Sequence, residues 1–235
     1  MKEFIFREDE SGNLIAEINP EFVRQSNMNM YNYKLKKSGI PREYYKYTFD
    51  NVIGFDERVI DKCKEYVDTF QDNEDTSLYF IGERNSGKTA LSCIIGMELL
   101  KKGYEVSFSE FQYLQDCFIT NQGFTKNPEI EDYIKKLKKS DVIIIDDCYD
   151  PEKSIRWKNS NHLIIAEWNY FIRSHISNEK KFIKTSNIPI ANVEMYWGKD
   201  IASMLSEGRG KFLELSVENT ELSKKSKQRI ELKKN

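Results

Sequence analysis

One eight-residue stretch, GERNSGKT at positions 82–89, constrains the fold of this chain more than any other part of its sequence. It follows the apolar run SLYFI (77–81) and precedes ALSCIIGMELLKKG (90–103), so it is expected to link a short strand to a helix. Glycines at both ends let the backbone curl so that successive N–H groups point inward, and the helix N-terminus adds its dipole. In this context the pattern G-x-x-x-x-G-K-[ST] predicts a loop that binds the phosphates of a nucleotide.

The side chains of this loop have distinct predicted roles. Lys88 would bring its charge to the β- and γ-phosphates, and Thr89 would offer a hydroxyl to Mg²⁺. The alternative, an ordinary surface loop, is disfavoured because a strand and a helix flank the motif. The residues expected to contact the nucleotide are Gly82, Asn85, Ser86, Gly87, Lys88, Thr89 and Ala90.

Polar residues also follow two other apolar strands. The run DVIIID (141–146) is apolar without alternation, which is typical of a strand buried on both faces. Asp146 ends that strand and is expected to order the ligands of Mg²⁺, and Asp147 is expected to polarise the attacking water. Asn187 follows the strand KFIKTS (181–186) and would orient that water or contact the γ-phosphate, although Ser-Asn-x-Pro is also ordinary turn chemistry.

The order of the predicted elements indicates an α/β fold with a parallel sheet flanked by helices. Residues 3–18 are expected to form a hairpin, residues 20–47 a polar connector, and Ser109 the N-cap of a helix. The strands are expected at 77–81, 104–108, 141–146, 181–186 and 211–217, and the helices at 59–70, 90–103, 109–121, 128–140, 162–177 and 198–206. We divide the chain into an N-terminal arm (1–37), a core (38–217) and a basic tail (218–235).

The composition is that of a polar globular protein of 235 residues with 39% hydrophobic and 31% charged residues. No apolar run approaches the roughly 20 residues of a membrane-spanning helix, and the N-terminus lacks a secretory signal, so we expect no membrane association and a cytoplasmic location. Four scattered cysteines and two histidines argue against a disulfide framework or a zinc site.

Four segments together carry a resemblance to a known family. SGIPREYYKYTFDNV (38–52), LYFIGERNSGKTALSCIIGMELLKKGYEVSF (78–108), KKSDVIIIDDC (138–148) and KFIKTSN (181–187) resemble the DnaC/DnaI-type replicative helicase loaders and the related IstB-type transposition helper ATPases. The resemblance covers about residues 38–215 and implies an AAA+ P-loop ATPase core that uses ATP, ADP and Mg²⁺. It also implies that Gly82–Thr89 is the Walker A motif, Asp146 and Asp147 are the Walker B motif, and Asn187 is sensor 1.

The resemblance implies a helicase loader that acts at replication initiation, with a replicative DNA helicase, single-stranded DNA and further copies of itself as partners. Aromatic rings would stack on bases and lysines would follow phosphates. For Phe118 the alternative is a core position, because Phe111, Leu114 and Phe118 have core-facing spacing, and for the lysines it is a solvated helix face. The DNA-binding candidates are Phe118, Phe124, Lys135, Lys136, Lys138 and Lys139.

The sequence departs from the family in two places. Met204 stands where the family usually carries an arginine that acts on a neighbour's nucleotide, and Arg209 is the displaced candidate for that role. Only about 37 residues precede the match, so the short arm is the expected helicase-binding segment, and a phage or mobile element is the expected source. Open alternatives are a transposition helper and a nucleotide-dependent adaptor with little hydrolysis. A small-molecule kinase is disfavoured, because 187–215 holds a single arginine.

Overall fold

The core of the protein is a parallel five-stranded sheet in the order β4-β5-β6-β3-β7. The computed structural model describes residues 3–8, 14–72, 76–121, 126–154, 162–206 and 211–219. The predicted α/β fold is confirmed, and the strands lie within a few residues of their predicted positions. They are β3 (Thr76–Ile81), β4 (Val106–Glu110), β5 (Val142–Cys148), β6 (Lys181–Ser186) and β7 (Lys211–Ser216).

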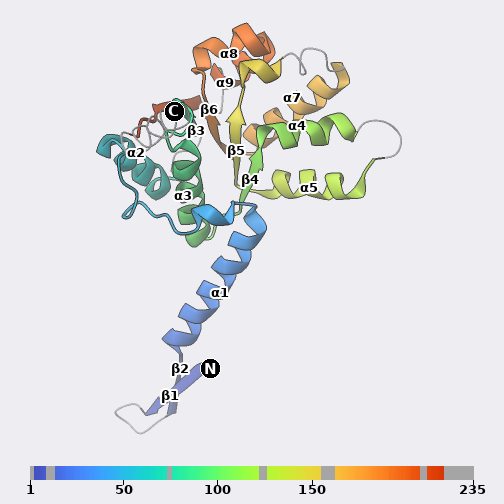
Figure 1. The fold of residues 1–235 in the computed structure, drawn as a ribbon. Helices are drawn as coiled ribbons and strands as arrows, with labels where there is room; N and C mark the ends of the chain where they lie inside the picture. The colour runs from blue at the N-terminus through green and yellow to red at the C-terminus, as the bar shows by residue number, and fades with distance from the viewer. Residues whose placement is uncertain are drawn as a thin grey trace, which may run out of the picture.

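Helices cover both faces of this sheet, so the core has three layers (Figure 1). One face packs on α2 (Glu57–Asp68) and α3 (Lys88–Lys101) through a cluster that includes Leu78, Phe80 and Ile144. The other face packs through Tyr79, Ile145 and Phe182 on the second group of helices. That group consists of α4 (Phe111–Thr120), α5 (Pro128–Lys139), α7 (His162–Ser177), α8 (Ile190–Trp197) and α9 (Lys199–Ser206). Consecutive strand residues alternate between the two clusters, as the pleat of a strand requires.

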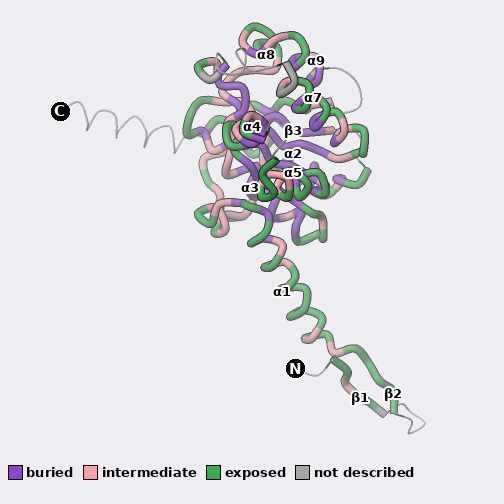
Figure 2. Tube along the Cα trace, turned by 90° about the vertical axis from the view of Figure 1, so that its right-hand side faces the viewer, coloured by how far each residue is buried: buried purple, intermediate pink, exposed green. Residues whose placement is uncertain are grey.

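The N-terminal arm projects from the core (Figures 1 and 2). The predicted hairpin is confirmed as β1 (Phe4–Glu8) paired antiparallel with β2 (Leu14–Ile18). The prediction of a polar connector at 20–47 is wrong for the first part of that range, because α1 (Pro20–Ser38) is a helix of 19 residues. Asn19 caps its first turn, accepting a hydrogen bond from the backbone N–H of Glu21 at 3.0 Å, and Gly39 ends it with φ of 83°.

Two other expectations about helices are corrected. Ser109 does not cap α4: it lies in β4, and Glu110 occupies the N-cap position. Helix α8 was not predicted, because its short sequence IANVEMYW has no clear helical period. In the part of the chain that the structure describes, no helix combines the length and the apolar character that crossing a membrane would take. Phe124, Arg209 and the basic tail from residue 220 lie outside the described residues.

Candidate functional site

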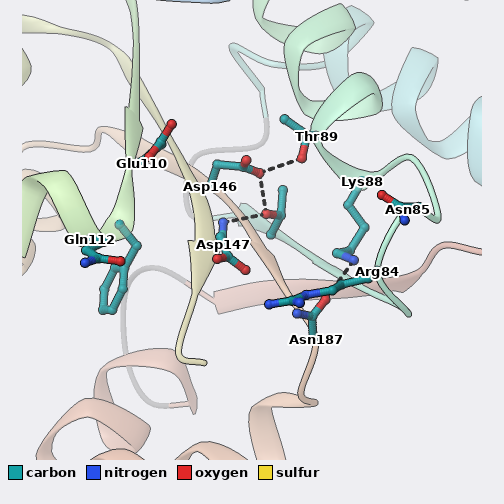
Figure 3. Close-up of a pocket in the computed structure, with 11 residues that line it drawn as sticks. Arg84, Asn85, Lys88, Thr89, Glu110, Gln112, Asp146, Asp147 and Asn187 are labelled. Atoms are coloured by element: carbon teal, nitrogen blue, oxygen red, sulfur yellow. Dashed lines mark hydrogen bonds between the residues drawn. The ribbon is translucent and has the colours of Figure 1, made fainter. Parts of the chain in front are cut away.

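A cleft of about 370 Å³ lies where several parallel strands end. Residues from the glycine loop after β3, from the end of β5 and from the segment after β6 meet there (Figure 3). Three motifs separated by up to about a hundred residues in the sequence therefore form one site, as parallel strands with a common carboxyl edge require. The lining consists of Arg84, Asn85, Lys88, Thr89, Glu110, Phe111, Gln112, Asp146, Asp147, Thr185 and Asn187.

The glycine loop has the backbone that its sequence predicts. Gly87 has φ of 94°, in the left-handed region that favours glycine, and begins α3 as its N-cap. A Cβ on Gly82 would lie 2.3 Å from the carbonyl oxygen of Val217 and 2.8 Å from Ser86 Oγ. Gly82 therefore lets the loop pack tightly against the chain that follows β7. The side chains of Asn85, Lys88 and Thr89 line the cleft, whereas Ser86 is buried.

Lys88 links the loop to the end of β6. Its Nζ donates hydrogen bonds to the carbonyl oxygens of Gly82 (2.9 Å) and Glu83 (2.8 Å) and to Asn187 Oδ1 (3.1 Å). Burial lowers the pKa of Lys88, and the nearby Asp146 and Asp147 carboxylates oppose this shift. The ammonium group therefore lies among neutral oxygens, inside a cleft whose far wall is acidic.

Asp146 receives two hydroxyl hydrogen bonds on one carboxylate oxygen. Thr89 Oγ1 donates to Asp146 Oδ1 at 2.8 Å, and Thr185 Oγ1 donates to the same atom at 2.6 Å. Burial raises the pKa of the Asp146 carboxyl, while these two hydrogen bonds act in the opposite direction. A threonine hydroxyl and a carboxylate in contact are hard oxygen donors from two elements, and they fit Mg²⁺.

Asp147 lies in a bulge that strand β6 holds in place. The register between β5 and β6 shifts between Ile145 and Cys148, and Asp147 has φ of 55°. Its backbone N–H donates to Thr185 Oγ1 at 2.9 Å. On the next residue of β6, Ser186 Oγ donates to the Cys148 carbonyl oxygen at 2.8 Å. The bulge aims both acidic residues at the cleft (Figure 3).

Sequence reasoning assigned no role in the site to five residues of the lining: Arg84, Glu110, Phe111, Gln112 and the supporting Thr185. Glu110 is the last residue of β4 and pairs in register with Asp146, so it too lies at the carboxyl edge. The signal that would have found it is its position at the end of a strand, which the assignment of Ser109 to a helix obscured.

The DNA-binding candidates have different surroundings. Phe118 is 5% exposed, and its ring packs against Trp168 and Phe171 at centroid distances of 5.6 and 5.5 Å. It therefore occupies the core-facing alternative, and its side chain also borders the second cleft. Exposure is expected of the α5 lysines both for contact with DNA and for a solvated helix face. All four of these lysines are exposed, namely Lys135, Lys136, Lys138 and Lys139.

A second cleft, of about 250 Å³, lies beside these lysines. Lys126, Lys135 and Lys138 line it together with Tyr170 of α7, which is 68% exposed. Lys138 Nζ lies 5.7 Å from the centroid of the Tyr170 ring. This cleft combines an accessible aromatic ring with ammonium groups and with the carboxylates of Glu131 and Glu167. Tyr170 was not predicted, because it lies on a different helix from the lysines.

Met204, which was expected to stand where the resembled family usually carries an arginine, is 8% exposed; it lies on α9 and belongs to the core cluster on that side of the sheet. Arg209, the displaced candidate, lies outside the described residues. The described part of the chain therefore presents no arginine at that position.

No protein-family model matches the chain. A curated protein of Bacteroides fragilis, described as "Insertion sequence IS21-like putative ATP-binding protein", is 29% identical over 117 residues. That match covers 49% of this chain and 42% of the relative's length.

Three solved structures share the fold. The DnaC helicase loader matches with a TM-score of 0.59 and 19% identity, covering 74% of this chain and 99% of that chain. DnaI matches with a TM-score of 0.60 and 17% identity, over 75% and 94% of the two chains. The replication initiator DnaA, bound to AMPPCP and single-stranded DNA, matches with a TM-score of 0.59 and 18% identity, over 81% and 56%.

The chain has the AAA+ P-loop NTPase fold. Its structural neighbours include helicase loaders and DnaA, and a curated relative is an IS21-like protein, in agreement with the resemblance found in the sequence.

Proposed function

We propose that this protein binds ATP with Mg²⁺ and hydrolyses it at the cleft between the glycine loop and the ends of β5 and β6. The observation that carries this proposal is the meeting of Lys88, Thr89, Asp146, Asp147 and Asn187 in one cleft. Nucleotide hydrolysis needs phosphate-binding groups, oxygen ligands for a divalent cation and a group that orients water, and these residues include each kind.

The chain's own residues would divide the work as follows. The N–H groups of the loop and Lys88 bind the β- and γ-phosphates, replacing the carbonyl contacts that Lys88 makes here. Thr89 and Asp146 would hold Mg²⁺, which supplies charge neutralisation at the phosphates when it is bound. Asp147 polarises the attacking water, and Asn187 orients it or contacts the γ-phosphate.

Two substitutions test these roles. Lys88→Ala should abolish binding of a fluorescent ATP analogue, whereas Asp147→Asn should bind it normally and lose turnover. Lys101→Ala, at the far end of the same helix, is the matched control for Lys88 and should change neither the binding of the ATP analogue nor the turnover. An Asp147→Asn protein with unaltered hydrolysis would refute the role given to Asp147, and retained binding by Lys88→Ala would refute the site.

We further propose that the ATPase is a loader for a replicative DNA helicase. The supporting observation is that the chain matches 99% of the DnaC loader and 94% of DnaI in fold. The arm provides a surface for such a partner. In the register of the hairpin, Phe4 pairs with Ile18, and Phe6 shares the same face with Leu14.

The exposure of that hairpin face supports a role in binding. Phe4, Phe6, Leu14 and Ile18 are 44%, 67%, 71% and 60% exposed. A two-stranded hairpin alone is at best marginally stable in water, so an apolar partner surface would stabilise it. We therefore propose that residues 1–37 bind the helicase, that residues 38–217 form the ATPase core, and that residues 218–235 are a basic tail.

Size-exclusion chromatography with light scattering tests the loader function. The protein should form a complex with the replicative helicase of its host that depends on Mg²⁺ and ATP. A chain lacking residues 1–18 should lose this complex but keep its nucleotide affinity, because β1 and β2 pair only with each other in the described sheets. No complex in either nucleotide state, beside intact ATP binding, would refute the loader function.

Single-stranded DNA is the third proposed ligand, and the cleft beside α5 is its proposed site. Exposed Tyr170 offers a face for base stacking, and Lys126, Lys135 and Lys138 offer charges to phosphates. Tyr170→Leu should weaken binding of a labelled oligonucleotide at least tenfold, and Tyr170→Phe should preserve it, because stacking needs only the ring. Equal affinities of the two variants would refute stacking at this site.

The alternative function, a transposition helper, is favoured by the match to the IS21-like relative. A transposition helper should bind duplex DNA and a transposase, whereas a loader should bind a hexameric helicase. Pull-down with both partners therefore separates the two functions.

A further inference from the structure

The cleft contains a second cation that no motif assigned. Among the described residues that line it, the cationic side chains are those of Lys88 and Arg84. Lys88 is buried and makes three hydrogen bonds, whereas the Arg84 side chain is 77% exposed. Arg84 is the third residue of GERNSGKT, so the phosphate loop itself carries a guanidinium group.

Arg84 is held loosely at the rim of the cleft. Its Nη2 lies 3.9 Å from Asp150 Oδ2, which is too long for a direct hydrogen bond. The Asp150 side chain is 9% exposed and is anchored by the backbone N–H of Glu152, which donates to its Oδ1 at 2.9 Å. Figure 3 shows the Arg84 side chain extending from the loop toward the side of the cleft where Asp147 lies, and Arg84, Asn187 and Asp147 all line the cleft.

We propose that Arg84 is a catalytic residue that contacts the γ-phosphoryl group from within the same chain. This inference rests on the proposed ATP hydrolysis. In that reaction, water attacks the γ-phosphorus, the bond from this phosphorus to the β–γ bridging oxygen breaks, and ADP and inorganic phosphate leave. The proton of the water passes to the Asp147 carboxylate or to a phosphate oxygen. Negative charge spreads over the transferring group, and a guanidinium close to it stabilises that charge.

The position of Arg84 explains how this chain can manage without the arginine that Met204 replaces. A guanidinium on the phosphate loop reaches the nucleotide of its own subunit, so it needs no neighbour to supply the charge. Asp150 acts as a positioning residue, because it keeps the guanidinium at the rim until a phosphate offers shorter, bidentate contacts. Turnover per molecule should then be independent of protein concentration.

Binding of ADP with and without aluminium fluoride tests the proposal apart from turnover, because that complex mimics the transferring phosphoryl group. A fluorescent ADP analogue is titrated into the wild type, Arg84→Gln, Arg84→Lys and Arg58→Gln. Arg58 is an exposed arginine on α2 that pairs with Asp56 at 2.7 Å, so it is a matched control away from the cleft. Thermal melts of all four proteins establish that they are folded.

We expect Arg84→Gln to keep its ADP affinity within about threefold and to lose the tightening by aluminium fluoride. Turnover should fall on the order of a hundredfold or more. Compared with Arg84→Gln, Arg84→Lys should recover part of the turnover and part of the tightening by aluminium fluoride. Lysine restores the positive charge but not the planar guanidinium group, which can make two parallel hydrogen bonds. Unchanged aluminium fluoride binding in Arg84→Gln, or specific activity that rises with protein concentration, would overturn the role of Arg84. A wild type that binds no ADP or ATP would overturn the proposed ATPase and this inference with it.

Discussion

Replacing Thr185 with valine tests whether β6 holds the acidic bulge of β5. Thr185 is 1% exposed, and valine has nearly the same shape, so the change leaves no cavity. It removes the hydroxyl that donates to Asp146 Oδ1 at 2.6 Å and that accepts from the Asp147 backbone N–H at 2.9 Å. The two hydrogen bonds are therefore lost together, and packing is retained.

The expected destabilisation follows from these two bonds. A hydrogen bond to a charged group contributes about 1.5–3 kcal/mol, and a buried donor that loses its acceptor costs about 1–3 kcal/mol. Asp146 keeps the hydrogen bond from Thr89, so the lower half of these ranges applies. We expect the free energy of unfolding to fall by about 3 kcal/mol, a large part of the roughly 5–15 kcal/mol of a typical domain.

Urea unfolding followed by circular dichroism measures this difference. Thr185→Ser keeps the hydroxyl and loses one methyl group, so it should cost only about 1 kcal/mol. Thr120→Val is the control for the chemical change itself, because its exposed hydroxyl bonds only the Asp116 carbonyl oxygen of its own helix. If Thr185→Val cost less than 1 kcal/mol, or if the serine variant lost as much as the valine variant, β6 would not hold the bulge through this hydroxyl.

Two more predictions concern buried titratable groups, and a third concerns the glycine loop. Burial lowers the pKa of Lys184 to about 8, so the unfolded chain binds more protons above that value, and stability should rise by about 1.4 kcal/mol per unit between pH 8 and pH 10. Urea curves of Lys184→Met should lack this rise, and a parallel rise would contradict the prediction. Burial lowers the pKa of His175 to about 3, so stability should fall as the pH drops from 6.5 toward 3. His175→Phe should show a shallower fall in acid titrations; equal slopes would exclude His175 as the cause. Gly82→Ala should lower the melting temperature and abolish nucleotide binding, because its Cβ would meet the backbone oxygen of Val217 at 2.3 Å; an unchanged melt would show that the loop can shift.

Local patterns were sufficient to predict the sheet and the centre of the site. The runs at 77–81 and 141–146 are apolar because β3 and β5 are buried on both faces, and this burial is visible in the sequence alone. The glycine loop was predictable for a similar reason, since its conformation depends on residues within the loop. Gly87 has the left-handed backbone that its glycine allows.

The arm shows where local patterns mislead. Helix α1 is largely exposed, so it has no apolar stripe, and its polar composition suggested a connector. Its ends did carry signals: Asn19 and Pro20 at the start and Gly39 at the end. Capping residues report on the backbone of a helix whether or not its side chains are buried, so they were the better guide here.

The supporting residues of the site could not be predicted, because they depend on which strands are neighbours. The sequence shows where each strand ends, but it does not show that β6 lies between β3 and β5. That order brings Thr185 against the bulge of β5 and places Asn187 beside Lys88. Residues with a chemical signature, such as Lys88 and Asp146, were found from their motifs, whereas Thr185 acts through the residues of the neighbouring strand. Its role therefore follows only from the order of the strands in the folded sheet, and its substitution tests how this site is held together.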